Sequence, residues 1–131
     1  MDDKAIKTVL IVDDDSFLLD MYAMRFTQAG FSVITAMSAE ETISKIKEGA
    51  NPDVALLDVV MPNTDGFELL ERINNEGLIP KTIKIFLSNL GQEQDISRGK
   101  SLGAASYIVK ASSTPSEVVA HVTEVLKNHG I

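Results

Sequence analysis

The stretch Leu10-Ile11-Val12-Asp13-Asp14-Asp15 places three carboxylates directly after a short apolar run. The run, Thr8–Val12, is rich in Val, Ile and Leu and lacks polar alternation, which is typical of a strand buried on both faces of a parallel sheet. In open α/β folds, ligand sites form beyond the carboxyl ends of such strands. Both the fold and the candidate site of this chain therefore depend on where the same pattern recurs.

The same kind of apolar run recurs four more times. The runs begin roughly every 22 to 30 residues, at Ser32–Thr35, Val54–Leu57, Ile83–Leu87 and Ser106–Val109. The segments between them have helical spacing; in the first of them, Phe17, Met21 and Met24 predict the apolar face of a helix. The segment 92–102 is the poorest in large apolar residues and predicts a short, loosely held helix.

Capping residues mark the helix boundaries independently of the apolar pattern. Ser38, Asp65 and Thr114 each stand three residues before a glutamate, as in a capping box, and Pro115 takes the first helical position. A glycine suited to a left-handed C-cap follows each predicted helix: Gly30, Gly49, Gly77, Gly103 and Gly130. The pattern is (βα)₅. It predicts one α/β domain over residues 1–131, a doubly wound five-stranded parallel sheet with helices on both faces.

Length, composition and charge exclude several classes of protein. With 131 residues, 44% of them hydrophobic and 24% charged, the chain has the composition of one globular domain. Its net charge of −7 would repel a phosphate backbone, so we expect no nucleic acid partner. The chain has no cysteine, and its longest apolar runs are far shorter than the roughly 18 residues of a membrane span. We expect a cytoplasmic protein with no membrane partner.

Polar side chains follow four of the five predicted strands. Asp13 and Asp14 follow the first strand, Asp58 the third, Ser88 the fourth and Lys110 the fifth. If the first and third strands are neighbours, the carboxylates converge, and two of them about 5 Å apart repel by roughly 3 kcal/mol at an effective dielectric near 20. Three carboxylates together need a cation or must take up a proton, and an all-oxygen ligand set favours Mg²⁺ over zinc.

Together these stretches resemble the receiver domain of the bacterial two-component response-regulator family. The resemblance runs from about residue 7 to residue 128 and is carried, in order, by Leu10–Asp15, Pro52–Pro62, Asp65-Gly66, Ile85–Ser88 and Gly103–Lys110. It implies a flavodoxin-like strand order of 2-1-3-4-5. It also implies a phosphorelay function, in which an aspartate takes a phosphoryl group from a histidine kinase or a phosphotransfer protein.

The resemblance implies roles for the acidic residues. Asp58 is the expected phosphoacceptor, a carboxylate nucleophile. Asp14, Asp58 and the backbone carbonyl of Val60 are the expected direct ligands of Mg²⁺, and Asp13 is expected to act mainly through metal-bound water. By the same resemblance we expect a phosphoacceptor with self-catalysed phosphorylation and dephosphorylation rather than an enzyme.

The resemblance also implies a switch. Lys110 and Ser88 are expected to contact oxygens of the phosphoryl group, Lys110 after first pairing with Asp58. Phosphorylation is expected to draw Ser88 inward, so that Tyr107 turns from an outward to an inward rotamer. This changes the face formed by the fourth predicted helix, the fifth strand and the fifth helix, where we expect a downstream protein to bind.

One departure from the family pattern concerns the peptide after Lys110. The family usually has a proline there, often after a cis bond, whereas this chain has Ala111. A cis bond before a non-proline residue costs roughly 2.5–4 kcal/mol. Because Lys110 has to reach the phosphoryl group, we nevertheless expect a cis Lys110–Ala111 peptide.

Three alternatives belong to other functional classes. An aspartyl-nucleophile phosphatase of the haloacid-dehalogenase type needs threonine or valine where this chain has Phe17, and it needs a cap domain. A flavin-binding module needs a glycine- and hydroxyl-rich phosphate loop where this chain has three acids. A receiver-like interaction module that takes no phosphate is disfavoured by the intact acid, serine and lysine set. We expect a stand-alone regulator that is a monomer or a weak dimer.

Overall fold

The computed structural model describes residues 6–131, so the first five residues of the predicted domain lie outside the described residues. Strands and helices alternate along the whole described chain. In order they are β1 (Thr8–Val12), α1 (Ser16–Gln28), β2 (Ser32–Ala36), α2 (Ala39–Lys47), β3 (Val54–Leu57), α3 (Gly66–Asn75), β4 (Ile83–Ser88), α4 (Glu93–Ser101), β5 (Ser106–Val109), the 3₁₀ turn η1 (Lys110–Ser112) and α5 (Pro115–Asn128). All five predicted strands are confirmed, with β2 and β4 one residue longer than expected.

The strands form one parallel sheet in the order β2-β1-β3-β4-β5, which confirms the predicted order. The register brings the carboxyl ends of the central strands level, since Val12 pairs with Leu57 and Leu57 with Phe86. The backbone N–H of Asp58 donates to the carbonyl of Val12 at 3.0 Å. Asp13 and Asp58 therefore leave the sheet side by side.

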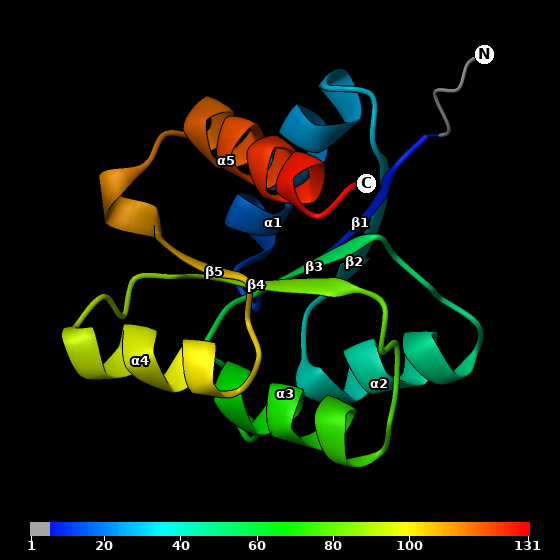
Figure 1. Ribbon diagram of the computed structural model, residues 1–131, viewed down its shortest axis with the longest axis vertical. Coiled ribbons are helices and arrows are strands. Elements are labelled where there is room, and N and C mark those ends of the chain that lie inside the picture. Colours follow the sequence, from blue (N-terminus) through cyan, green and yellow to red (C-terminus); the bar gives the residue numbers. More distant parts are fainter. Residues whose placement is uncertain (1–5) are drawn as a thin grey trace.

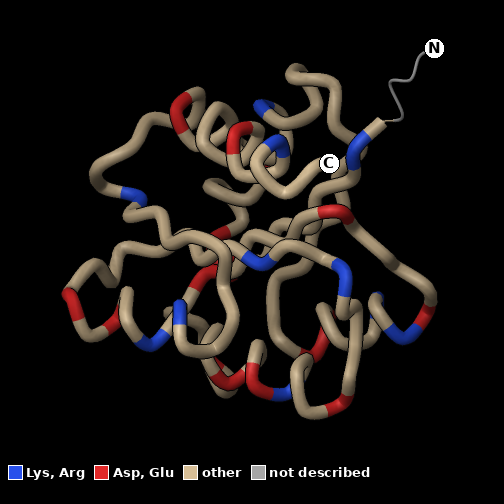
Figure 2. Tube along the Cα trace, viewed as in Figure 1, with Lys and Arg blue, Asp and Glu red and all other residues tan. Residues whose placement is uncertain are grey.

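Helices cover both faces of the sheet, with α1 and α5 on one side and α2, α3 and α4 on the other (Figure 1). Val9 and Ile11 of β1 pack toward α1 and α5, whereas Leu10 and Val12 pack toward α2 and α3. Burial on both faces explains the absence of polar alternation in the strands. Acidic and basic positions are interspersed over the helices of both layers (Figure 2). No helix within residues 6–131 is long and apolar enough to cross a membrane.

The predicted apolar face of α1 is wrong for Phe17 and Met24, whereas Met21 is half-buried and packs against the core. Phe17 is 77% exposed and Met24 is 60% exposed, and the helix instead buries Leu19, Tyr22 and Phe26 against the sheet and α5. Both sets have helical spacing, because α1 is apolar over most of its circumference. The packing of α1 against the sheet and α5 decides between them.

The predicted helix caps are confirmed. Asp65 and Thr114 form complete capping boxes, and the hydroxyl of Ser38 accepts the N–H of Glu41 at 3.1 Å. Each of the five glycines that follow a helix has a positive φ, as a left-handed C-cap requires: Gly30, Gly49, Gly77, Gly103 and Gly130.

The helix α4 is held to the sheet through one small residue. Of the nine described residues of α4, only Gly99 is buried, as the thin apolar pattern of this segment predicts. A Cβ at Gly99 would lie 2.9 Å from the ring of Phe86 and 3.0 Å from the ring of Tyr107. Arg98 adds a contact with α3, with its guanidinium 4.6 Å from the centre of the Phe67 ring. Few apolar contacts therefore hold α4 in place.

Gly66 sets the path of the backbone behind Asp58. It opens α3, and its N–H donates to the carbonyl of Val59 at 2.8 Å. A Cβ built on Gly66 would lie 2.0 Å from the carbonyl oxygen of Asp58. No side chain fits there, so glycine is what allows the loop after β3 to fold back against the strand end.

We predict that Gly66→Ala lowers the free energy of unfolding by about 2–4 kcal/mol, because the added methyl group meets backbone that cannot move aside. Urea unfolding measures this loss. Gly77→Ala is the control, since Gly77 has a positive φ of 65° but nothing within 4 Å of its Cβ position. It should cost only about 1–2 kcal/mol through its backbone conformation. Equal losses in the two variants would contradict the close-approach explanation.

Candidate functional site

Three carboxylates meet at the carboxyl ends of β1 and β3, as the sequence predicts. Oxygens of Asp13, Asp14 and Asp58 all lie within 4.8 Å of one another. Asp13 is 2% exposed and Asp58 is 6% exposed, whereas Asp14 is open to solvent. Two of the three carboxylates are therefore buried, and only Asp14 can be reached from solvent.

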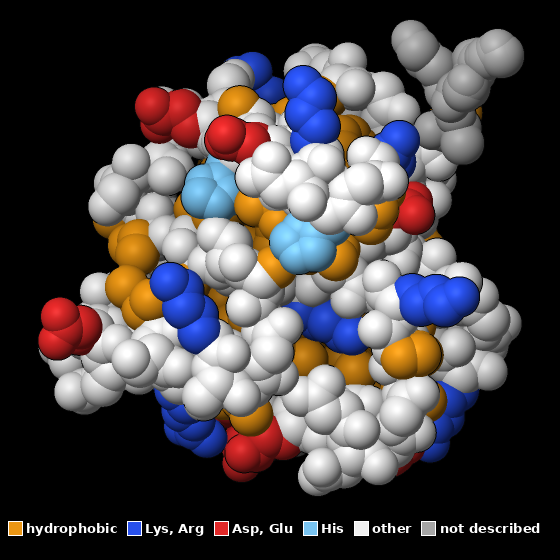
Figure 3. Space-filling model, in the orientation of Figure 1, with side chains coloured by type: hydrophobic (Ala, Val, Ile, Leu, Met, Phe, Trp, Pro, Cys, Tyr) orange, Lys and Arg blue, Asp and Glu red, His pale blue; other side chains and the backbone are white. Residues whose placement is uncertain are grey.

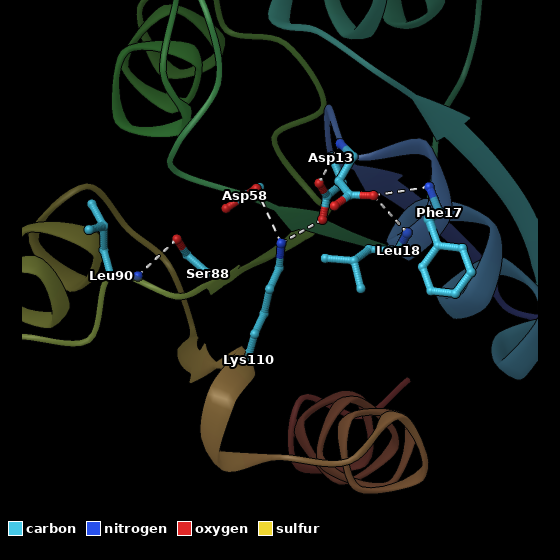
Figure 4. Close-up of polar contacts among 8 residues, drawn as sticks. Asp13, Phe17, Leu18, Asp58, Ser88, Leu90 and Lys110 are labelled. Atoms are coloured by element: carbon cyan, nitrogen blue, oxygen red, sulfur yellow. Dashed lines mark hydrogen bonds and ion pairs between the residues drawn. The ribbon is translucent and has the colours of Figure 1, made fainter.

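Lys110 inserts its ammonium between two of these carboxylates (Figure 4). The Nζ atom lies 2.6 Å from Oδ2 of Asp13 and 3.2 Å from Oδ2 of Asp58, and the lysine side chain is only 8% exposed. The side chain comes from the end of β5, two strands away from Asp58 in the sheet. Its ammonium neutralises part of the negative charge that the sheet register creates.

The expected cis peptide between Lys110 and Ala111 is wrong, since residues 6–131 contain no cis bond. The trans bond leads into the turn η1, and the long side chain of Lys110 still reaches Asp58. The reach of the lysine stem makes the cost of a non-proline cis bond unnecessary.

The third aspartate of the run has a different role. The Oδ1 atom of Asp15 accepts the backbone N–H of Phe17 at 3.0 Å and of Leu18 at 3.1 Å, so Asp15 is the N-cap of α1. Asp13 in turn accepts the N–H of Asp15 at 2.9 Å. Two of the three acids thus fix the start of α1, and Asp13 also belongs to the acidic group.

Ser88 and Tyr107 lie on the other side of Asp58. Ser88 is fully buried at the end of β4, and its hydroxyl accepts the N–H of Leu90 at 3.3 Å. The Tyr107 hydroxyl donates to the carbonyl of Leu90, so this side chain is turned toward the loop between β4 and α4. Burial raises the pKa of Tyr107, and the Ser88 hydroxyl opposes that rise. Ser88 therefore lies between Asp58 and Tyr107, and Tyr107 contacts the loop through Leu90.

The family model for the response regulator receiver domain matches residues 9–123. The chain belongs to this family. Among its relatives, the phosphate regulon transcriptional regulatory protein PhoB of Pseudomonas aeruginosa is 35% identical over 95% of this chain and 53% of its own length. The alkaline phosphatase synthesis transcriptional regulatory protein PhoP of Bacillus subtilis is 33% identical over 95% of this chain and 50% of its own length. The receiver domain thus spans about half the length of these curated relatives.

Solved structures show the same likeness over the whole domain. A CheY-like response regulator receiver domain protein from Methanospirillum hungatei JF-1 superposes with a TM-score of 0.84 at 30% identity, covering 95% of this chain and 96% of that one. The chemotaxis protein CheY4 of Vibrio cholerae gives a TM-score of 0.84 at 28% identity, covering 92% and 99%. The predicted flavodoxin-like receiver fold is confirmed.

The donor set of this receiver domain fits a magnesium ion. It consists of carboxylate oxygens from Asp13, Asp14 and Asp58, and no histidine or cysteine belongs to the group among the described residues. Val60, in the loop after β3, is 57% exposed, and no group within residues 6–131 donates a hydrogen bond to its carbonyl. That carbonyl is available as a further oxygen ligand.

Burial and charge act against each other at the centre of the site. Burial raises the pKa of Asp58, and the Asp13 carboxylate adds to the rise, while Lys110 and Ser88 oppose it. Burial alone would lower the pKa of Lys110, but its bonds to Asp13 and Asp58 outweigh burial and leave that pKa raised. The ammonium therefore stays charged, and ionised Asp58 is held at a cost to folding.

We predict that Asp58→Asn stabilises the receiver domain at pH 7 in metal-free buffer. A carboxyl with a raised pKa in the folded state favours folding only while it is protonated, so its ionised form destabilises at neutral pH. Asparagine removes that charge, and Lys110 keeps its bond to Asp13. A gain of about 1 kcal/mol would raise the melting temperature by roughly 4 °C.

The gain should shrink as the pH falls, and it should vanish below the ordinary carboxyl pKa of 3.8, where Asp58 is protonated in both states. Thermal unfolding of the parent and the variant across this pH range measures the difference. A variant that is less stable than the parent at pH 7 would show that the pair with Lys110 outweighs the burial of Asp58.

Proposed function

We propose that this receiver domain accepts a phosphoryl group on Asp58, in a Mg²⁺-dependent step of a two-component phosphorelay. The observation that carries the proposal is the position of the Lys110 ammonium, which bonds to Asp58 and Asp13 inside a group of three carboxylates. A charged donor beside a buried carboxylate is suited to a nucleophile whose product carries more negative charge than the reactant.

The transfer needs little from the protein besides position and charge. An oxygen of Asp58 attacks the phosphorus of a phosphohistidine, a P–O bond forms, and the P–N bond to the imidazole breaks. The Lys110 ammonium then exchanges its contact with the Asp58 carboxylate for one with an oxygen of the bound phosphoryl group. The Ser88 hydroxyl, buried at the end of β4, donates to another oxygen.

Asp14, Asp58 and the carbonyl of Val60 would hold the magnesium ion, with Asp13 acting through its water. When bound, the ion neutralises charge on the phosphoryl oxygens during transfer. Asp13 has to exchange part of its bond to Lys110 for this role. Asp14 is the exposed member and has no such bond among the described residues, so it is free to bind first.

The output surface is the one formed by α4, β5 and α5. Tyr107 of β5 already contacts the loop after β4 through the Leu90 carbonyl, and Gly99 lets α4 lie against its ring. Hydrophobic atoms are exposed on this side of the molecule between α5 and the helix layer that contains α4 (Figure 3). A shift of Ser88 toward a phosphoryl group would change the space around Tyr107 and hence the seating of α4, whose contacts are few. We propose a protein target for this surface.

Treatment with acetyl phosphate and Mg²⁺ tests the proposal. We predict one added phosphoryl group by intact-mass spectrometry, absent without Mg²⁺ and absent in Asp58→Asn. Asp65→Asn, which alters a carboxylate that only caps α3, is the matched control and should be phosphorylated as the parent is. If the parent gains no phosphoryl group, the domain is an interaction module that takes no phosphate. An equal gain in Asp58→Asn would place the acceptor elsewhere.

We predict a long-lived phosphorylated form. Hydrolysis needs a water in line with the phosphorus, and the side chains two residues after Asp58 and two after Ser88 flank that approach. They are Val60, 57% exposed, and Leu90, 39% exposed, and neither can orient a water by hydrogen bonding. The double variant Val60→Asn with Leu90→Glu should lose phosphate about tenfold faster, which corresponds to roughly 1.4 kcal/mol in the transition state. Unchanged decay of a radiolabelled protein would show that these positions do not control water access.

A further inference from the structure

Tyr22 of α1 carries a buried hydroxyl for which the fold supplies no partner. The side chain is 3% exposed and packs in the apolar layer between α1, α5 and the sheet. No group within residues 6–131 forms a hydrogen bond with its hydroxyl, although a buried hydroxyl without a partner destabilises the folded state. Phenylalanine would fill the same space without that cost, so packing alone does not account for the hydroxyl group.

Tyr22 lines the same pocket as Lys110, so its side chain reaches the edge of the core that lies next to the acidic group. Burial raises the pKa of Tyr22, the ammonium of Lys110 lowers it, and the carboxylates of Asp13 and Asp58 raise it. Three charged groups of the site are therefore within electrostatic reach of the phenol oxygen, and the lysine is the one with the largest influence.

A pocket connects the two residues. It has a volume of about 370 Å³ and opens between α1 and the segment that runs from η1 into α5. Tyr22 and Lys110 both line it, next to the polar Asn89 and the apolar Leu18 and Pro115. A water molecule takes about 30 Å³ in the liquid, so the pocket has room for one that bridges the two side chains.

Lys110 has a hydrogen to give. An ammonium carries three N–H donors, and two of them are used by Asp13 and Asp58. If Asp13 helps to hold the metal ion during transfer, its contact with the ammonium would weaken, and the ammonium would then need another acceptor to keep its direction.

We propose that Tyr22 is a positioning residue for Lys110. Its hydroxyl accepts the third N–H of the ammonium through one water in the pocket, and keeps the ammonium aimed at the oxygens of the phosphoryl group. The inference rests on the proposed phosphorylation of Asp58. In this proposal the direction of the Lys110 side chain depends on Tyr22 of α1 as well as on the acidic residues.

The experiment is a double-mutant cycle on the rate of Asp58 phosphorylation at saturating acetyl phosphate and Mg²⁺. Tyr22→Phe should lower the rate about tenfold in the parent and leave it unchanged in a Lys110→Met background, because the hydroxyl acts only through the ammonium. Its melting temperature should equal or exceed that of the parent. Thr27→Ala, which removes an exposed hydroxyl from the same helix, should leave the rate unchanged.

A second measurement reads the contact without phosphorylation. The chain has two tyrosines, so labelling with 3-fluorotyrosine gives two ¹⁹F resonances, which Tyr107→Phe assigns. Lys110→Met should shift the Tyr22 resonance. A parent that takes no phosphate would refute the proposed function. Equal rates for the parent and Tyr22→Phe, an equal loss in the Lys110→Met background, or an unmoved resonance would each overturn the role of Tyr22.

Discussion

Repulsion among three carboxylates within 4.8 Å of one another is the constraint on which the rest of this structure depends. The parallel register of β1 and β3 creates it, because Asp13 and Asp58 leave the sheet at the same level. Lys110 reduces it by placing an ammonium between two of the acids, and the fifth strand has to end where that ammonium can arrive. The site is thus a repulsive arrangement of charge held together by the sheet, and the proposed metal ion and phosphoryl group would each change it directly.

The helices differ in how firmly they are held to the sheet, and the difference suits a switch. On one side α1 and α5 bury large side chains, including Phe26, Val118 and Leu126, and pack against each other and the sheet. On the other side α4 buries only Gly99 among its described residues. Its neighbours α2 and α3 bury large side chains such as Ile43, Phe67 and Ile73, so α4 alone is the weakly held helix of this layer. Tyr107 lies between Ser88 and α4. In the proposed switch, α4 is therefore the element that a change at Asp58 would move most easily.

The strands, the caps and the identity of the site residues could be predicted because they depend on local features of the chain. Apolar runs, capping boxes and C-cap glycines such as Gly103 each leave a mark within a few residues of sequence. The buried face of α1 could not be predicted, since apolar residues surround the helix and only the sheet decides that Tyr22 faces inward and Phe17 outward. The peptide after Lys110 was wrongly predicted because the family pattern there depends on a proline that this chain lacks, and the trans chain reaches the site through the turn η1.

By itself, the sequence determined the (βα)₅ order of elements, the acidic pair after the first strand, the aspartate after the third and the lysine after the fifth. These are properties of the order of residues, and hydrophobic periodicity and capping chemistry express them locally. Only the tertiary structure decided that the Lys110 ammonium bonds to Asp13 as well as Asp58, that Gly66 lies against the backbone of Asp58, and that the Tyr22 hydroxyl lies beside the charged group without a partner among the described residues. The contacts of Lys110 and the position of Tyr22 join segments far apart in the chain, and Gly66 meets Asp58 across the loop that follows β3. They are fixed by strand register and helix packing, which no local pattern contains.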